Sequence, residues 1–106
     1  MNNQSSDKFE ILRKIVNQPK STQIILAKNL NLSLGKVNYC LKALRDKGLI
    51  KINNFKKNPN KINYMYILTP KGIRKKTELT MSFMKKKISE YEELKKELKL
   101  SHKEKN

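Results

Sequence analysis

The sequence contains few of the residues on which disulfide-bonded, metal-binding or catalytic proteins depend. Cys40 is its one cysteine and His102 its one histidine, so no disulfide can close within the chain and no Cys/His group has metal-site spacing. There is no glycine-rich phosphate loop, and the basic region holds no pair of carboxylates suited to acid and base roles. We therefore expect no enzyme, no cofactor and no metal site, and a reducing compartment, by default the cytoplasm.

Long apolar runs are absent too. The longest uninterrupted aliphatic segment covers residues 24–27, far short of the roughly 20 residues that span a bilayer. The first ten residues lack the apolar stretch of a secretory signal. The sequence therefore predicts neither insertion into a membrane nor secretion.

Acidic residues are scarce relative to basic ones. The chain has 9 Asp and Glu against 25 Lys and Arg, a net charge of +16. Such a charge favours a polyanionic partner, with nucleic acid first and an anionic membrane second. Lysine supplies most of the cations and asparagine is frequent, a bias that an AT-rich coding sequence also produces. The charge alone is thus suggestive of nucleic-acid binding but not decisive.

The charge is also unevenly spread over a chain that is long enough for one small domain. Residues 1–88 carry all of the net positive charge, whereas residues 89–106 contain 5 basic and 5 acidic side chains. With 37% hydrophobic residues the core is small, and self-repulsion at +16 opposes compaction, so dimerisation would help. We expect the binding surface and the association surface to lie in different parts of the chain.

Apolar residues at helical spacing predict three helices before residue 48. The first covers residues 7–17, with Ser5, Ser6 and Asp7 as possible caps and Pro19 preventing continuation. The second is short and opens at Ser21 and Thr22, with an apolar pattern of Ile24, Ile25, Leu26 and Leu30. The third runs from Leu34 to Lys47 behind Ser33 as N-cap, with a stripe of Val37, Leu41 and Leu44 flanked by Leu34 and Cys40.

After Gly48 the apolar period changes from helical to alternating. Ile50, Ile52 and Phe55 predict one strand, and Ile62, Tyr64, Tyr66 and Leu68 predict another, around a basic turn. Thr69 then caps a final helix that Pro70 begins. The fold class is mainly α (α+β): a winged helix-turn-helix with a two-stranded β-hairpin wing and a long C-terminal dimerisation helix.

In that architecture the second helix of the helix-turn-helix pair enters the major groove. The face of residues 34–47 opposite the apolar stripe therefore predicts the DNA contacts: Ser33, Gly35, Lys36, Asn38, Tyr39 and Lys42. Asn38 suits bidentate pairing with adenine, and Lys36 suits guanine or phosphate. The wing adds Lys56, Lys57, Asn58, Asn60 and Lys61. Because this wing lacks arginine, it indicates backbone contact more than base reading.

The final helix carries a long, thin apolar stripe at steps of three and four residues. A small head cannot cover such a stripe, which indicates a seam for another helix, as in a coiled coil. The predicted dimerisation residues are Ile73, Thr77, Thr80, Met84, Ile88, Tyr91, Leu94 and Leu98.

At the third helix the residues are specific enough to name a family. Residues 34–44 (LGKVNYCLKAL), 47–48 (KG), 54–56 (NFK), 68–73 (LTPKGI) and 90–92 (EYE) resemble the small MarR-type transcriptional regulators linked with exopolysaccharide biosynthesis loci. The resemblance covers about Asp7 to Leu98. It implies a bacterial, cytoplasmic and nucleoid-associated transcription factor that binds a palindromic site on double-stranded DNA as a homodimer. Larger MarR-type proteins dimerise through helices from both chain ends, whereas here residues 73–98 would do so, and any small-molecule effector is unknown.

These expectations divide the chain into four parts: a disordered N-terminus (1–6), a winged helix-turn-helix domain (7–68), a long dimerisation helix (69–100) and a disordered tail (101–106). Two other functions stay open. The chain could bind nucleic acid without sequence preference, RNA included, or it could be an adaptor whose last helix binds a different helical protein. A membrane-surface role for the last helix ranks lower, because Thr77, Thr80 and Tyr91 stand where larger apolar residues are expected.

Overall fold

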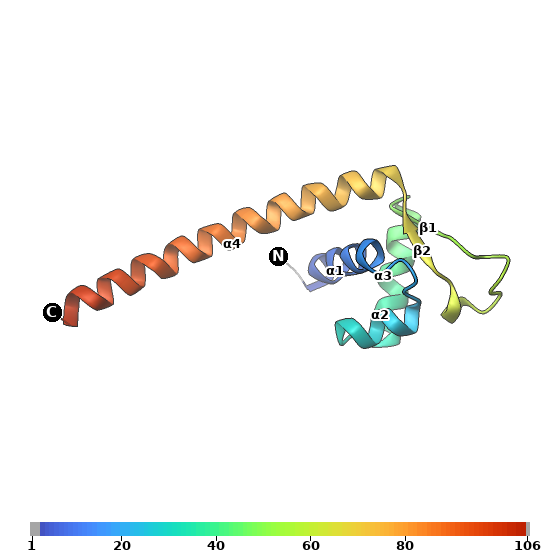
Figure 1. The fold of residues 1–106 in the computed structure, drawn as a ribbon, viewed down its shortest axis with the longest axis horizontal. Helices are drawn as coiled ribbons and strands as arrows, with labels where there is room; N and C mark the ends of the chain where they lie inside the picture. The colour runs from blue at the N-terminus through green and yellow to red at the C-terminus, as the bar shows by residue number, and fades with distance from the viewer. Residues whose placement is uncertain (1–2, 106) are drawn as a thin grey trace. The chain divides into compact units, whose positions relative to one another are not determined.

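The computed structural model describes residues 3–105, which divide into two compact units between Lys76 and Thr77. The first unit holds three helices, α1 (Asn3–Asn17), α2 (Gln23–Leu30) and α3 (Leu34–Asp46), and then a hairpin (Figure 1). The hairpin consists of β1 (Ile50–Ile52), a single 3-10 turn η1 (Lys61–Asn63) and β2 (Tyr66–Leu68). Helix α4 (Pro70–Lys105) starts in the first unit and forms all that is described of the second. This order confirms the predicted winged helix-turn-helix fold.

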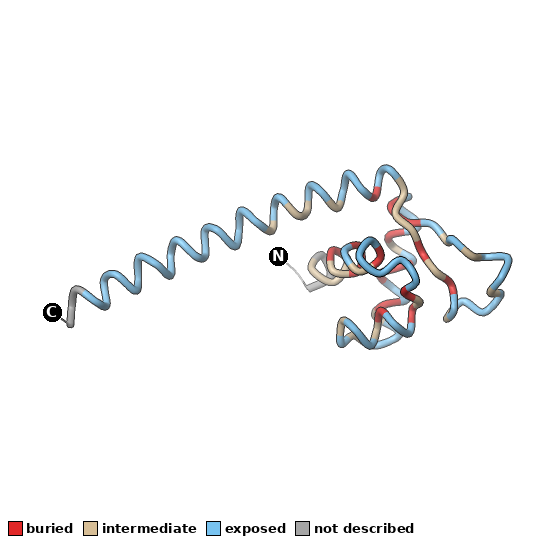
Figure 2. Tube along the Cα trace, viewed as in Figure 1, coloured by how far each residue is buried: buried red, intermediate tan, exposed pale blue. Residues whose placement is uncertain are grey.

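The core of the first unit lies where α1, α2, α3 and the hairpin meet, shown in red in Figure 2. Helices α1 and α3 each bury an apolar stripe, and α2 buries Leu26. The hairpin region adds four residues to the core: Leu49, Ile50, Tyr64 and Tyr66. Four aliphatic residues of α1, α2 and α3 are exposed instead: Val16, Ile24, Ile25 and Leu34. A helix packed on one side buries only a stripe about one third of its circumference, and these residues lie outside that stripe.

Helix α1 begins earlier than the sequence predicts. It starts at Asn3, so Ser5, Ser6 and Asp7 lie inside the helix and the prediction that one of them caps it is wrong. The Asp7 side chain instead pairs with Lys36 of α3. The predicted disordered N-terminus, residues 1–6, thus includes the first turn of α1, while Met1 and Asn2 lie outside the described residues.

The helix-turn-helix is fixed by local hydrogen bonds. Thr22 caps α2, its hydroxyl accepting from the amide of Ile25 at 3.4 Å. Asn31 ends α2 in the left-handed conformation (φ 55°), which turns the chain within two residues into the next cap. There the Ser33 hydroxyl accepts from the amide of Lys36 at 3.0 Å. The predicted N-cap Ser33 is confirmed, and of the two residues predicted to open the second helix, Thr22 is the cap.

The strands of the wing are shorter than the alternating pattern predicts. They pair antiparallel in the register Ile50 with Leu68, Lys51 with Ile67 and Ile52 with Tyr66. Phe55, Ile62 and Tyr64 lie outside the strands, so their assignment to strands is wrong. The ladder ends because the side-chain oxygen of Asn54 accepts a hydrogen bond from the backbone amide of Met65 at 2.7 Å. Asn60 then caps the 3-10 turn η1.

Helix α4 opens as predicted. The Thr69 hydroxyl accepts from the amide of Gly72 at 3.0 Å, and Pro70 occupies the first helical position. The helix continues to Lys105, so the prediction of a disordered tail over residues 101–106 is corrected to helix for all of it except Asn106, which lies outside the described residues. From Met84 to His102 every residue is exposed, the pale blue stretch of Figure 2. No helix among residues 3–105 is both long and apolar enough to cross a membrane.

Candidate nucleic-acid interface

The exposed face of α3 is set by what the opposite face buries. Val37, Cys40, Leu41 and Leu44 are buried against the rest of the core. The helical period then leaves Ser33, Gly35, Asn38, Tyr39 and Lys42 on the outside, and all five are exposed. This face combines an amide, a phenol, a lysine and the free end of a helix, which are groups that contact bases and phosphates.

Gly35 has no structural reason to be glycine within the chain. A Cβ built on it would meet no atom within 4 Å, and its backbone does not adopt a positive φ. Glycine is less favourable than alanine in a helix, so an unconstrained glycine near a helix start lowers stability without an internal benefit. The missing side chain instead leaves room for an external partner to come close to the backbone of α3.

Lys36 and Tyr39 are not free on this face, because side chains of α1 contact both. The ammonium of Lys36 lies 3.6 Å from a carboxylate oxygen of Asp7. The ammonium of Lys8 lies 6.0 Å from the centre of the Tyr39 ring, within the range of a cation–π contact. Asp7 and Lys8 could not be predicted as neighbours of this face, because no local pattern signals a contact between helices so far apart in the chain.

A polar concavity of about 340 Å³ lies between α3 and the wing. Asn38, Lys42, Arg45 and Asp46 line it from α3, and Lys61, Tyr64 and Tyr66 line it from the hairpin. Arg45 was not among the predicted DNA contacts. Its place beside Asn38 and Lys42 could have been predicted, since residues 38, 42 and 45 fall on one helix face at steps of four and three. The concavity brings cations of α3 and the wing together around one amide.

Burial shifts the pKa of two groups beneath these surfaces. It raises the pKa of the Tyr66 phenol, and the nearby positive charge of Arg45 opposes that shift. Burial also raises the pKa of the Cys40 thiol, as does the charge of Asp7, while Lys36 and Lys8 oppose the rise. Both groups are therefore held in their neutral forms, which suits core packing and not nucleophilic chemistry.

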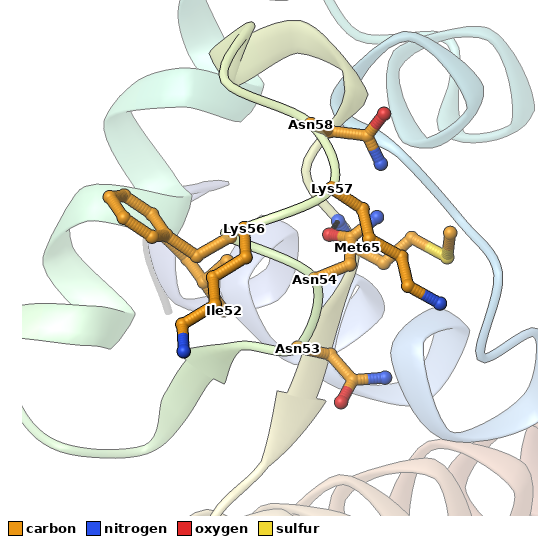
Figure 3. Close-up of a pocket in the computed structure, with 8 residues that line it drawn as sticks. Ile52, Asn53, Asn54, Lys56, Lys57, Asn58 and Met65 are labelled. Atoms are coloured by element: carbon orange, nitrogen blue, oxygen red, sulfur yellow. Dashed lines mark hydrogen bonds between the residues drawn. The ribbon is translucent and has the colours of Figure 1, made fainter.

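The wing is organised from its base by Asn54. Its Oδ1 accepts from the Met65 amide, while its Nδ2 is buried and, among the described residues, has no hydrogen-bond partner. Figure 3 shows Asn54 among the residues of the wing that line an open concavity of about 680 Å³, with Lys56, Lys57 and Asn58 along the same loop. Lys56, Lys57 and Lys61 are exposed and Asn58 is half-buried. Asn60 is exposed, but its side chain is engaged in capping, accepting from the Ile62 amide at 3.1 Å.

The seam predicted on α4 is exposed over the second unit. The exposed fractions rise from 56% at Met84 and Ile88 to 71% at Leu98. Tyr91 and Leu94 lie between these values, Ile73 and Thr77 are exposed as well, and Thr80 is half-buried. Apolar side chains at this spacing and exposure form a continuous strip on one helix.

Among residues 6–102, whose side chains the structure describes, no three His, Cys, Asp or Glu side chains lie close enough together to hold a metal ion. His102 is exposed near the end of α4, and Cys40 is buried and free.

Comparison with known proteins places this geometry in a family context. Residues 8–51 match the family described as winged helix-turn-helix DNA-binding. No curated protein matches the chain in sequence. Among solved structures, Lactococcus lactis ZitR in complex with DNA is similar, with 28% identity and a TM-score of 0.64 over 84% of this chain and 58% of that one.

Two further structures show the same fold. The MarR of Staphylococcus aureus, solved with salicylate and kanamycin, has 24% identity and a TM-score of 0.62 over 77% of this chain and 55% of that one. A MarR family regulator from Neisseria meningitidis has 21% identity and a TM-score of 0.64 over 80% of this chain and 56% of that one. The chain thus spans little more than half the length of these proteins.

Proposed function

We propose that this chain, which has the winged helix-turn-helix fold of MarR family transcription regulators, is a sequence-specific regulator that binds double-stranded DNA as a homodimer. The observation that carries the proposal is the polar face of α3. Its exposed Asn38 and Lys42 line a concavity that Lys61 of the basic wing also lines. The winged helix-turn-helix match and the likeness to a structure solved with DNA support DNA binding, and we assign the groove contact to α3.

Asn38 is the residue to which we assign base reading. It is exposed near the middle of α3, and a carboxamide there can accept from adenine N6 and donate to N7 in the major groove. Gly35 supports the same docking, because its missing side chain allows DNA to approach the start of the helix. Ser33 and Tyr39 flank these positions and are assigned to phosphate or thymine methyl contacts.

The cations around Asn38 are assigned to the DNA backbone. Lys42 and Arg45 follow it on α3, and Lys56, Lys57 and Lys61 extend the positive surface along the wing, with Asn58 and Asn60 beside them. Backbone contacts fix the position of the protein on the duplex without reading sequence. With about six phosphates neutralised per dimer, the affinity should fall with a log–log salt slope of about −5.

The homodimer is assigned to the seam of α4. Pairing two such strips would bury the exposed Met84, Ile88, Tyr91, Leu94 and Leu98 and hold two heads in a two-fold arrangement. Each α3 would then face a major groove about 34–36 Å from the other, which requires a palindromic operator. This regulator would act on the chromosome in the bacterial cytoplasm, and the resemblance of residues 34–44 supports exopolysaccharide biosynthesis genes as its targets.

Selection from a random duplex library at about 150 mM salt tests the proposal, because non-specific binding by lysines is weakened there. We expect enrichment of a two-fold-related motif with half-sites about 10 base pairs apart. The variant Asn38→Ala should lose about 1–3 kcal/mol of discrimination at one base pair of each half-site. Featureless enrichment would contradict sequence-specific regulation and favour sequence-independent binding or a helix-mediated adaptor.

A further inference from the structure

The ion pair between Asp7 and Lys36 joins α1 to the first turn of α3. The two charged atoms lie 3.6 Å apart, and the side chains are only 22% and 33% exposed, respectively. By comparison, the α1 pair of Glu10 with Arg13 is 41% and 49% exposed and stays within one helix. The Asp7 pair is thus the more shielded of the two, and it involves a cation of the proposed DNA-binding face.

Lys36 stands where a helix least favours a positive charge. It is the third residue of α3, close to the positive end of the helix dipole, and the first turn of α3 contains no acidic residue. Asp7 supplies from α1 the negative charge that α3 lacks. The carboxylate therefore occupies the place beside the Lys36 ammonium where an anion is favoured.

A DNA phosphate would be favoured at the same place for the same reasons. Ser33, Gly35 and Lys36 form the end of α3 that meets the duplex in the proposed function, so a phosphate near Lys36 competes with the Asp7 carboxylate for one ammonium. Any gain from the phosphate contact is reduced by the loss of the existing pair. This reduction applies to every sequence equally, because phosphates carry no sequence information.

We propose that Asp7 competes with the DNA backbone for Lys36. By restraining Lys36, Asp7 lowers the affinity for all duplexes equally. The base contacts of α3 then make up a larger share of the affinity for a given DNA sequence. The inference rests on the proposed DNA binding and adds a positioning residue on a helix that does not itself read the DNA. It predicts that removing the charge of Asp7, although Asp7 is paired, should raise the affinity for DNA.

The test measures binding of a labelled random-sequence duplex by fluorescence anisotropy across a series of salt concentrations. Asp7→Asn should bind about fivefold more tightly at about 150 mM salt, and its salt slope should steepen by about 0.9 per protomer, because one more lysine is free to replace counterions. Glu10→Gln is the matched control. It makes the same change in charge on α1 but breaks a pair that does not involve α3, so less than about a twofold change is expected.

Two further variants separate restraint from a structural role. Asp7→Glu keeps the carboxylate and should return the affinity towards the wild-type value. In a chain that already carries Lys36→Gln, adding Asp7→Asn should change the affinity no more than Glu10→Gln does. Thermal unfolding of each variant by circular dichroism identifies any that fail to fold, and in that event Asp7→Ser and the Asp7→Glu rescue provide the comparison.

The outcomes are distinct. Tighter binding by Asp7→Asn alone, dependent on Lys36, supports the inference. Equal effects of Asp7→Asn and Glu10→Gln, or weaker binding by a folded Asp7→Asn, overturn it while leaving the proposed function intact. A folded wild-type chain that binds no duplex at low salt overturns the proposed function, and the inference falls with it.

Discussion

Gly72 lies directly against the backbone carbonyl of Leu49. A Cβ built on Gly72 would overlap the Leu49 carbonyl oxygen, so the first turn of α4 can approach the start of β1 only because residue 72 has no side chain. The same junction is held by Thr69, whose hydroxyl donates to the Gly48 carbonyl at 2.5 Å and accepts from the Gly72 amide. Close approach and hydrogen bonding together fix where α4 begins.

Gly72→Ala should therefore destabilise the protein. The added methyl group cannot be accommodated without moving backbone, and overpacking of this kind lowers the free energy of unfolding by about 1–3 kcal/mol. Urea denaturation followed by circular dichroism measures the change. A variant with the stability of the wild type would show that the two segments are not in close contact.

Gly35→Ala should have the opposite effect on stability. No atom lies within 4 Å of the new methyl group, and alanine favours the helix by about 0.5–1 kcal/mol over glycine. If DNA approaches α3 closely at this position, the more stable variant should nevertheless bind the selected duplex more weakly. Denaturation and anisotropy on the same preparation measure both quantities. Unchanged DNA binding would remove Gly35 from the proposed interface.

Ile88→Glu should convert a dimer into a monomer. Ile88 lies in the middle of the exposed seam, where a buried carboxylate would have no partner in the proposed helix pair. Ser89→Glu is the matched control, because it introduces the same group one position away and off the seam. Light scattering gives the masses. A dimer that survives Ile88→Glu would show that the seam does not hold it together.

The buried Cys40 should make stability fall at alkaline pH. Because burial raises the pKa of the thiol above its ordinary value of 9.0, the folded state holds this proton more tightly than the unfolded state does. The resulting stabilisation is complete below about pH 9 and is lost as the pH rises through the raised pKa. Urea denaturation from neutral to alkaline pH should show a steeper fall for the wild type than for Cys40→Ala. Parallel curves would contradict this account.

Cap residues and helical spacing, which are local features of the sequence, predict the helix-turn-helix. Thr22, Ser33 and Thr69 cap the helices that follow them, and each cap bonds to an amide three residues further along, so short sequence windows contain the information. The buried stripe of α3 likewise follows from helical spacing alone. Helical spacing thus predicts the exposed positions of α3, except that Lys36 is half-buried.

Features that depend on contacts between distant residues could not be predicted from the sequence. The alternation of Ile62, Tyr64, Tyr66 and Leu68 predicts one strand, but the side chain of Asn54 ends the ladder from across the hairpin. Tyr64 is buried all the same, its ring 5.8 Å from that of Phe55. The contact of Asp7 with Lys36 is similar, since neither helix alone indicates that the other lies beside it.

The shortness of β1 and β2 has a consequence for how copies of this chain meet. A two-stranded sheet has an outer edge on each strand, and long flat edges recruit strands of other molecules into aggregates. Here each strand has three residues, and the middle residue of β1 is the exposed Lys51. Such edges are too short and too charged to serve as templates. The wing therefore offers no edge that would compete with the helical strip of α4, to which we assign the proposed dimer.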